Sequence, residues 1–168
     1  MINEKIQNIL NEQINKEFFS AYFYLMIAAN LEDKGLNGFA HWNRIQAQEE
    51  IDHGMIIFNY ILNSDGKIIL GEIKPPQCNC ENVLDVFEHI YRHEKSITSS
   101  INDVTILSMD ECDLATRTFI EWYINEQVEE EHAVADIVKR IKFANGDKAA
   151  LLQIDRELSK REYKKHEY

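Results

Sequence analysis

The sequence contains few residues that interrupt helices, with only two prolines and six glycines among 168 residues. Proline and mid-helix glycine are the residues that helices tolerate least. Since 45% of the residues are hydrophobic, the chain has enough apolar material for one full core. These proportions predict one mostly helical unit.

Long apolar runs are absent as well. The first ten residues, MINEKIQNIL, carry acids and amides where a secretory signal needs a basic start and an unbroken apolar stretch. No later run approaches the length that spans a membrane. We therefore expect no membrane partner and a cytoplasmic location.

Positive charge is scarce, because 18 lysines and arginines face 29 aspartates and glutamates and give a net charge of −11. This excess argues against a sequence-independent grip on phosphate backbones, so nucleic acid is not an expected partner. It is compatible with a surface that handles cations.

Cysteine is limited to Cys78, Cys80 and Cys112. The Cys78-Asn79-Cys80 pair lacks the second pair that a closed zinc site requires. We interpret all three as ordinary thiols, with a metal or redox role as the minor alternative.

Turn-forming residues divide the chain into four long segments and a short tail. The breaks lie near residues 33–38, 63–81, 108–113 and 145–146. The second break contains Gly71 and both prolines, and it is long enough to cross from one end of a bundle to the other. The pattern predicts an all-α four-helix bundle, at about residues 4–144, with one long crossover between helices two and three.

A short fifth helix is predicted at about residues 147–159, because Asn145-Gly146 is typical of a helix stop and Asp147 of a helix cap. A single four-helix bundle would leave its apolar face without a partner, which favours assembly. That face consists of Ala150, Leu151, Ile154 and Leu158. The basic residues after it are interpreted as a solvated end without a function; they are Lys160, Arg161, Lys164 and Lys165.

Each long segment has an inward row of apolar residues at alternating four- and three-residue steps. Near the middle of every row a carboxylate replaces an apolar residue: Glu17, Glu50, Glu94 and Glu130. His53 follows Glu50 by three residues, so both lie on one face, one turn apart. Gln127 lies one turn before Glu130 in the same way.

One such acid is most simply a side chain that reaches solvent or pairs with an arginine. Four acids at similar heights in the bundle need another explanation. Burying each unpaired carboxylate costs several kcal/mol, and the inward rows contain no lysine or arginine to pair with them. Two divalent cations would neutralise the four charges, and the nitrogen of His53 favours iron over calcium or magnesium. The rows predict a dinuclear transition-metal site, unless the helix faces are assigned wrongly.

A second pair with the same spacing, Glu129 and His132, lies on another face of the last long segment. Its row continues through Asp136 and Arg140, whereas the row of Gln127 and Glu130 continues through apolar residues only. Periodicity therefore selects Gln127 and Glu130 for the interior.

Three motifs resemble the non-haem ferritins of prokaryotes: residues 11–13 (NEQ) with Glu17, residues 48–50 (QEE) with His53, and residues 121–131 (EWYINEQVEEE). The similarity covers essentially the whole chain and implies a single ferritin-like di-iron domain over residues 1–168. In the general pattern of such di-iron bundles, two helices give a glutamate and two give a Glu-x-x-His pair. Here the resemblance implies one iron held by Glu17, Glu50 and His53 and a second held by Glu50, Glu94 and Glu130, with Gln127 beside them.

The same resemblance implies a third iron position with the ligands Glu49, Glu126 and Glu129, which shares Glu130. Adjacent acids in such runs are more often simply solvated. Tyr24 resembles the ferritin tyrosine beside the centre, which supplies an electron or a hydrogen bond. Its other interpretation is a core aromatic residue whose hydroxyl finds a partner.

The implied function is iron storage. The site would be a ferroxidase that oxidises Fe(II) to Fe(III) with dioxygen or peroxide, since carboxylates stabilise Fe(III) over Fe(II). Resemblance further implies a hollow homo-oligomeric shell of twenty-four copies with a ferric mineral inside.

Haem-binding bacterioferritins have a methionine directly before the histidine of the Glu-x-x-His pair, where this chain has Asp52, so no haem is expected. The mini-ferritins that build their site across two subunits lack the tail helix, and rubrerythrins add a Cys-x-x-Cys iron domain; this sequence shows neither pattern. Two alternatives of other classes are a di-iron oxygenase or peroxidase with an organic substrate and a purely structural bundle.

Overall fold

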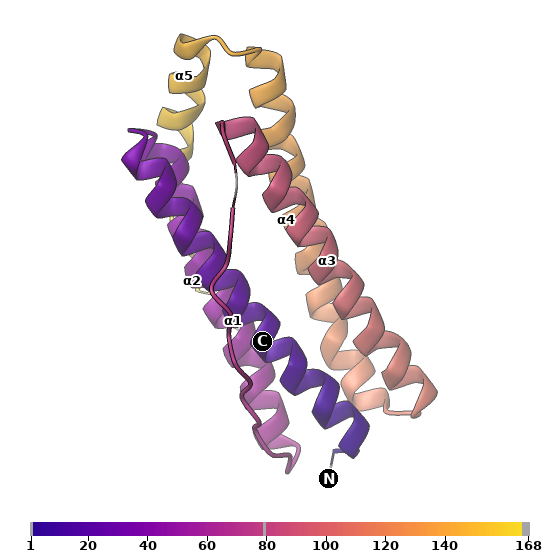
Figure 1. Cartoon of the computed structure of the whole chain (residues 1–168). Helices are drawn as coiled ribbons and strands as arrows, with labels where there is room; N and C mark the ends of the chain where they lie inside the picture. The colour runs from indigo at the N-terminus through magenta and orange to yellow at the C-terminus, as the bar shows by residue number, and fades with distance from the viewer. Residues whose placement is uncertain (1, 79, 166–168) are drawn as a thin grey trace.

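The computed structural model describes residues 2–78 and 80–165, and these residues form five helices and no strand (Figure 1). The helices are α1 (Glu4–Asp33), α2 (Asn37–Asn63), α3 (Val83–Asp110), α4 (Leu114–Ala144) and α5 (Lys148–Leu158). The predicted four-helix bundle with a tail helix is confirmed. None of the described helices is long and apolar enough to cross a membrane.

Asparagine and aspartate side chains define where four of the helices begin. Each accepts a hydrogen bond from a backbone N–H in the first turn, which satisfies a donor that the helix itself leaves without a partner. The capping residues of α1, α3, α4 and α5 are, in that order, Asn3, Asn82, Asp113 and Asp147.

Helix α2 takes its cap from α5 instead. Leu36 precedes α2 and provides no side-chain cap, but Asp155 Oδ1 accepts hydrogen bonds from the N–H of Gly38 at 2.8 Å and of Phe39 at 2.9 Å. A Cβ at Gly38 would lie 1.7 Å from the backbone oxygen of Asp155, so only glycine allows this approach. The contact ties the tail helix to the end of the bundle.

The apolar face of α5 packs against its own subunit. Ile154 and Leu158 are buried in the cluster at that end of the bundle, and Ala150 and Leu151 pack against the same cluster. The expectation that this face lacks a partner within one chain is therefore wrong. Sequence could not reveal the docking, because the capping contact joins residues 117 positions apart.

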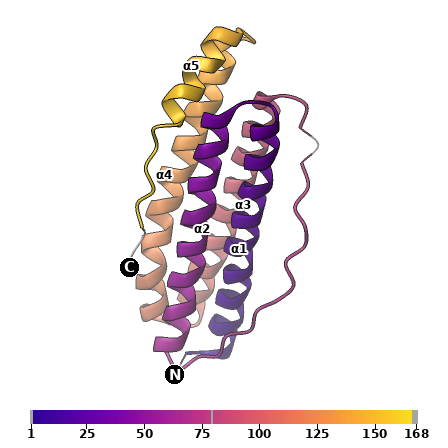
Figure 2. The same ribbon diagram turned by 90° about the vertical axis from the view of Figure 1, so that its left-hand side faces the viewer.

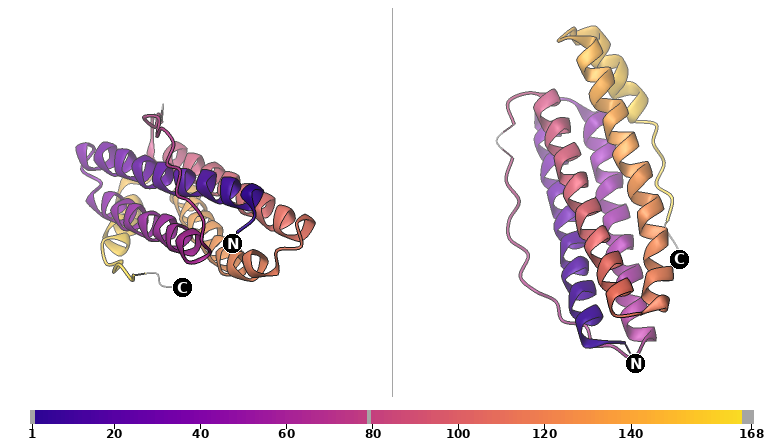
Figure 3. Two further views of the ribbon diagram at one scale, coloured as in Figure 1. Left: turned by 90° about the horizontal axis from the view of Figure 1, so that it is seen from below. Right: turned by 90° about the vertical axis from the view of Figure 1, so that its right-hand side faces the viewer.

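The crossover, described at residues 64–78 and 80–82, runs along the outside of the bundle beside α1 (Figures 2 and 3). Three amide side chains of α1, spaced by four residues, accept hydrogen bonds from backbone N–H groups of the crossover. They are Gln7, Asn11 and Asn15, and the distances are 2.7, 2.7 and 3.1 Å in that order. These acceptors satisfy backbone donors of a segment that has no secondary structure of its own.

The crossover also contains a disulfide between Cys78 and Cys80, with an S–S distance of 2.09 Å. Cys112 is a free, exposed thiol. The interpretation of all three as ordinary thiols is wrong for the first two. Their Cα atoms lie 5.4 Å apart, within the range that a disulfide bridges, and residue spacing alone does not reveal that distance.

The core consists of two apolar clusters at opposite ends of the bundle. The tail-end cluster, next to α5, includes Phe23, Ile27, Phe39, Phe87 and Ile137. The far-end cluster includes Ile6, Leu10, Ile57, Ile61 and Phe119. The buried acids Glu17, Glu50, Glu94 and Glu130 lie between the two clusters, at the middle of the long helices.

Candidate metal centre

All four long helices contribute a buried acid to the middle of the bundle. Helix α1 contributes Glu17, α2 contributes Glu50 and His53, α3 contributes Glu94, and α4 contributes Gln127 and Glu130. Each of these side chains is buried within the described chain. The structure thus brings together all six residues that the inward rows predict.

The acids form two groups that share one residue. Glu17, Glu50 and His53 each offer a ligand atom, and the three atoms lie within 4.8 Å of one another; the same holds for Glu50, Glu94 and Glu130. Ligands bound at about 2.0–2.2 Å from one cation lie at most about 4.4 Å apart. Small side-chain adjustments would therefore let each group enclose a cation, with Glu50 between the two.

Two neutral hydrogen-bond donors orient the carboxylate of Glu94. The Tyr24 hydroxyl donates to Glu94 Oε1, and Gln127 Nε2 donates to Glu94 Oε2 at 2.8 Å. These two bonds hold both oxygens of one carboxylate, as outer-shell partners do in metal sites.

The acids on α1 and α4 each have an amide partner. Gln13 Nε2 donates to Glu17 Oε1 at 2.8 Å, and Gln46 Nε2 donates to Glu130 Oε2 at 2.5 Å. Glu17 Oε2 is buried and accepts no hydrogen bond from an amide or hydroxyl of the described residues. Such an oxygen suits a cation, so the donor set fits metal binding.

Burial raises the pKa of Glu17 and of Glu94, and raises that of Glu50 and Glu130 well above the ordinary value. Neighbouring carboxylates raise the pKa of Glu50 and Glu130 further. Without a cation the cluster therefore retains protons, and a bound cation would displace them. A cation bound at this centre would take the place of protons.

Two tyrosines lie against the centre. Tyr24 is fully buried, and burial followed by the charge of Glu94 raises its pKa well above the ordinary value. Its hydroxyl therefore stays protonated and donates a hydrogen bond to Glu94. Tyr123 donates a hydrogen bond of 2.6 Å to the backbone oxygen of His53, which positions the helix turn that carries the imidazole. Sequence reasoning did not single out Tyr123.

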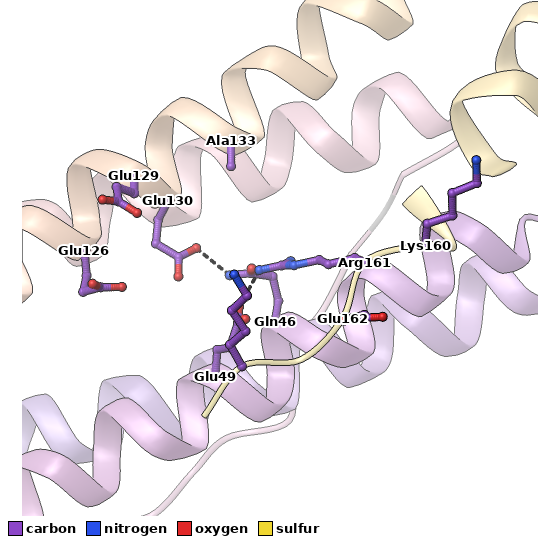
Figure 4. A pocket seen from close by; sticks show the side chains of 10 residues that line it. Gln46, Glu49, Glu126, Glu129, Glu130, Ala133, Lys160, Arg161 and Glu162 are labelled. Carbon is purple, nitrogen blue, oxygen red and sulfur yellow. Dashed lines mark hydrogen bonds and ion pairs between the residues drawn. The ribbon is translucent and has the colours of Figure 1, made fainter. Parts of the chain in front are cut away.

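The three further acids lie together outside the buried pair. Glu49, Glu126, Glu129 and Glu130 line one pocket of about 580 Å³ (Figure 4). The pocket is also lined by Arg161 of the basic tail, whose Nη2 lies 2.5 Å from Glu49 Oε2. The interpretation of this tail as a solvated end is therefore wrong at Arg161.

Sequence reasoning missed the roles of Gln13, Gln46 and Arg161. The first two carried a usable signal, because Gln13 precedes Glu17 by one turn and Gln46 precedes Glu50 by one turn. Arg161 carried none, since it follows the last helix. Among the remaining histidines, His41 Nε2 lies 2.8 Å from the backbone oxygen of Arg161 and His93 Nε2 lies 2.8 Å from Ser20 Oγ, so both have partners away from the paired groups.

A helical bundle with two carboxylate-rich groups that share a glutamate at its centre defines the class of two-metal carboxylate proteins. The chain belongs to the ferritin family: the family model, described as a ferritin-like domain, matches residues 7–144.

Similar proteins extend over nearly the whole chain. The bacterial non-heme ferritin of Bacteroides fragilis (strain 638R) is 37% identical over 161 residues, which is 96% of this chain and 100% of the relative. The bacterial non-heme ferritin of Campylobacter jejuni is 37% identical over 142 residues, covering 84% of this chain and 85% of the relative. A crystal structure of an open pore ferritin from Archaeoglobus fulgidus superimposes with a TM-score of 0.95 and 41% identity, covering 96% of this chain and 100% of that one.

Proposed function

We propose that this chain is the subunit of an iron-storage ferritin and that its buried centre is a ferroxidase. The observation that carries the proposal is the sharing of Glu50 between two groups whose ligand atoms each lie within 4.8 Å. Family membership supports it, since the relatives are non-heme ferritins over almost their whole length.

The proposed substrate is a pair of Fe(II) ions. Glu17, Glu50 and His53 would hold one and Glu50, Glu94 and Glu130 the other, with Glu50 as the bridge. Gln127 lies beside the pair and, through its hydrogen bond, orients Glu94. Hard carboxylate oxygens favour Fe(III), so binding here makes each Fe(II) a better reductant.

Two Fe(II) ions supply two electrons, enough to reduce dioxygen to peroxide or peroxide to water. The protons displaced from the buried acids on iron binding leave the ligands ionised for Fe(III). Tyr24, whose hydroxyl keeps its proton beside Glu94, is placed to donate a hydrogen bond or an electron. The Fe(III) product then leaves for a mineral.

The pocket of Glu49, Glu126, Glu129 and Glu130 supports a third cation position next to the pair. Because Glu130 belongs to both the pair and the pocket, the pocket offers a route between the buried centre and the surface. We propose it as the site where iron waits or departs.

We also propose that the subunits form a closed shell of twenty-four copies. Large apolar side chains lie exposed on the single chain, as expected for surfaces that another copy covers. Examples are Phe143 with 93% of its surface exposed, Leu114 with 73% and Val128 with 66%. The single domain and the cytoplasmic location stay predictions from the sequence.

The test adds two Fe(II) ions per subunit to metal-free protein in air and follows the absorbance of Fe(III). Oxidation should be rapid, should saturate near two or three irons per subunit, and should be slow in Glu17→Ala, Glu94→Ala and Glu130→Ala. A matched control is Glu121→Ala, because this acid on α4 is exposed and forms an ion pair with Arg117 one turn away on the same helix. Column elution should report a particle of shell size.

Oxidation no faster than in buffer, with all variants equal to the original, would contradict a ferroxidase and favour a structural bundle. Rapid oxidation by a particle of single-subunit size that forms no mineral would instead favour an enzyme with an organic substrate.

A further inference from the structure

The tail after α5 turns back along the bundle (Figure 2), and its contacts with α2 include the following three. His41 Nε2 lies 2.8 Å from the backbone oxygen of Arg161, and the guanidinium of Arg161 lies 4.7 Å from the ring centre of Trp42. Two residues further, the Tyr163 hydroxyl donates a hydrogen bond of 2.5 Å to Asp52 Oδ2. The tail is thus positioned by contacts at Arg161 and at Tyr163.

The guanidinium of Arg161 enters the acidic pocket. Its Nη2 lies 2.5 Å from Glu49 Oε2, and only 25% of the Arg161 side chain and 7% of the Glu49 side chain are exposed. Figure 4 shows the Arg161 side chain reaching between the tail and Glu49, on the side of Gln46 and Glu130. The inward rows of the bundle provide no lysine or arginine to this pocket, and the tail provides Arg161 instead.

We propose that Arg161 occupies the cation position of this pocket and competes with a metal ion for Glu49. The inference rests on the proposed function, which places iron in the adjacent pair. A guanidinium and a divalent cation need the same carboxylate oxygens, so Glu49 cannot serve both at full strength. Arg161 thereby limits the subunit to two firmly held irons until the tail moves aside.

The competition should be moderate, because an ion pair that is partly exposed to water is weak. Removing Arg161 should strengthen binding of the third ion about tenfold, which corresponds to about 1.4 kcal/mol. Binding of the ion held by Glu17, Glu50 and His53 should not change, because the ion pair of Arg161 is with Glu49. The ion that Glu130 helps to hold should bind only slightly more tightly, because Arg161 acts on Glu130 through its charge and not through a hydrogen bond.

The experiment is an anaerobic calorimetric titration of the full-length protein with Fe(II). It compares the original with Arg161→Gln and Arg161→Ala. Lys160→Ala is the matched control, because it removes the same charge from the same pocket without the bond to Glu49. The expected result is a third ion that binds about tenfold more tightly in both Arg161 variants than in the original or in Lys160→Ala. Thermal melting verifies that each variant is folded.

Equal affinity for the third ion in all four proteins would overturn the role of Arg161 and leave the ferroxidase standing, because the first two ions would still bind. An equal gain in Lys160→Ala would also overturn it, since general charge would then suffice. Absence of the first two ions from the original protein would overturn the proposed function and this inference together.

A second group of ligands lies where the crossover meets α3. Cys80 Sγ is 3.9 Å from His89 Nδ1, and ligand atoms of Cys78, Cys80 and His89 lie within 4.8 Å of one another. All three residues are half-buried, and burial followed by Arg92 lowers the pKa of His89, which favours the neutral imidazole that metals bind.

The geometry points to a thiolate–imidazole metal site that exists only in the reduced chain. A phosphine or thiol reductant supplies two electrons, and with two protons the disulfide becomes two thiols. Binding of Zn(II) or another thiophilic cation then releases these protons and engages two thiolates and one imidazole. A disulfide oxidant that accepts two electrons, and is itself reduced to two thiols, restores the S–S bond, removes two of the three ligands and so releases the cation.

The probe for this site is Co(II), whose thiolate complexes have charge-transfer absorption that carboxylate sites lack. Phosphine-reduced protein should show this absorption with one Co(II) per chain, and untreated protein should not. Cys80→Ser should abolish it and His89→Ala should weaken it, while Cys112→Ser, the matched control, should leave it unchanged. Absence of the band in the reduced protein, or its survival in Cys80→Ser, would overturn the site.

Discussion

The two apolar ends of the bundle and the polar layer between them are built by the same four helices, yet burial has opposite consequences in the two regions. At the ends it removes isoleucine and phenylalanine side chains from water and stabilises the fold. In the middle it removes glutamates from water and costs free energy until a cation arrives. The ends thus maintain a centre that would not fold by itself.

The largest effect should come from the apolar ends. Phe87→Ala removes a fully buried ring that packs edge-on against Phe39 in the tail-end cluster. We expect the free energy of unfolding to fall by about 3–5 kcal/mol because of the lost burial and the cavity. Chemical denaturation measures it, and the folded fraction should still oxidise iron. A loss under about 1 kcal/mol would mean that the ends do not carry the fold.

The polar layer should behave in the opposite way. In the metal-free protein, Glu130 has a pKa raised well above the value of 4.5 by burial and by Glu94 and Glu50. Its contribution to stability is therefore full below pH 4.5 and is lost as the pH rises through its folded pKa. Glu130→Gln, which cannot ionise, should be about 1–3 kcal/mol more stable than the original near pH 8 and nearly equal at pH 4.

Melting curves of both proteins across this pH range measure the difference. Zn(II), a cation that is not oxidised, should stabilise the original more at pH 8 than at pH 5, because it replaces the protons. A difference between the two proteins that shrinks as the pH rises would show that Glu130 is not a buried acid in need of a cation.

A smaller effect is expected for Tyr24, which lies where the tail-end cluster meets the polar layer, and it should show whether this residue affects iron oxidation or only packing. Tyr24→Phe keeps the buried ring but removes the hydroxyl that donates to Glu94. Loss of such an outer-shell partner should slow iron oxidation about tenfold, or about 1.4 kcal/mol. Tyr22→Phe, on an exposed ring of the same helix, is the control and should oxidise iron at the original rate. Stopped-flow absorbance distinguishes them, and equal rates would assign Tyr24 to packing alone.

The smallest effect should come from the tail helix. Asp147→Ala removes the cap whose side chain accepts from the N–H of Ala150 at 2.8 Å. We expect a loss of about 1 kcal/mol, confined to α5 and seen as faster amide hydrogen exchange there. Asp147→Asn should retain most of the protection. Faster exchange throughout α1–α4 would show instead that the tail helix supports the whole bundle.

The sequence was sufficient for the inward rows because helical periodicity is local. The spacing of Glu50 and His53, and the apolar residues that continue the row of Glu130, placed these side chains inside before any neighbour was known. It was insufficient where two distant segments meet. The face of Leu158 was expected to need a second copy, and the structure covers it with the chain's own bundle.

The amino-acid order by itself determined the helices, the caps of α1, α3, α4 and α5 and the faces on which the buried acids lie, because these depend on residues within a few positions of one another. Tertiary structure alone decided that Asp155 caps α2 across 117 residues and that Arg161 reaches Glu49 across 112. Such pairs form only when the packing of the apolar ends has positioned the helices. Their hydrogen bonds need donor and acceptor atoms within about 3.2 Å, and spacing along the chain does not reveal which distant groups come that close.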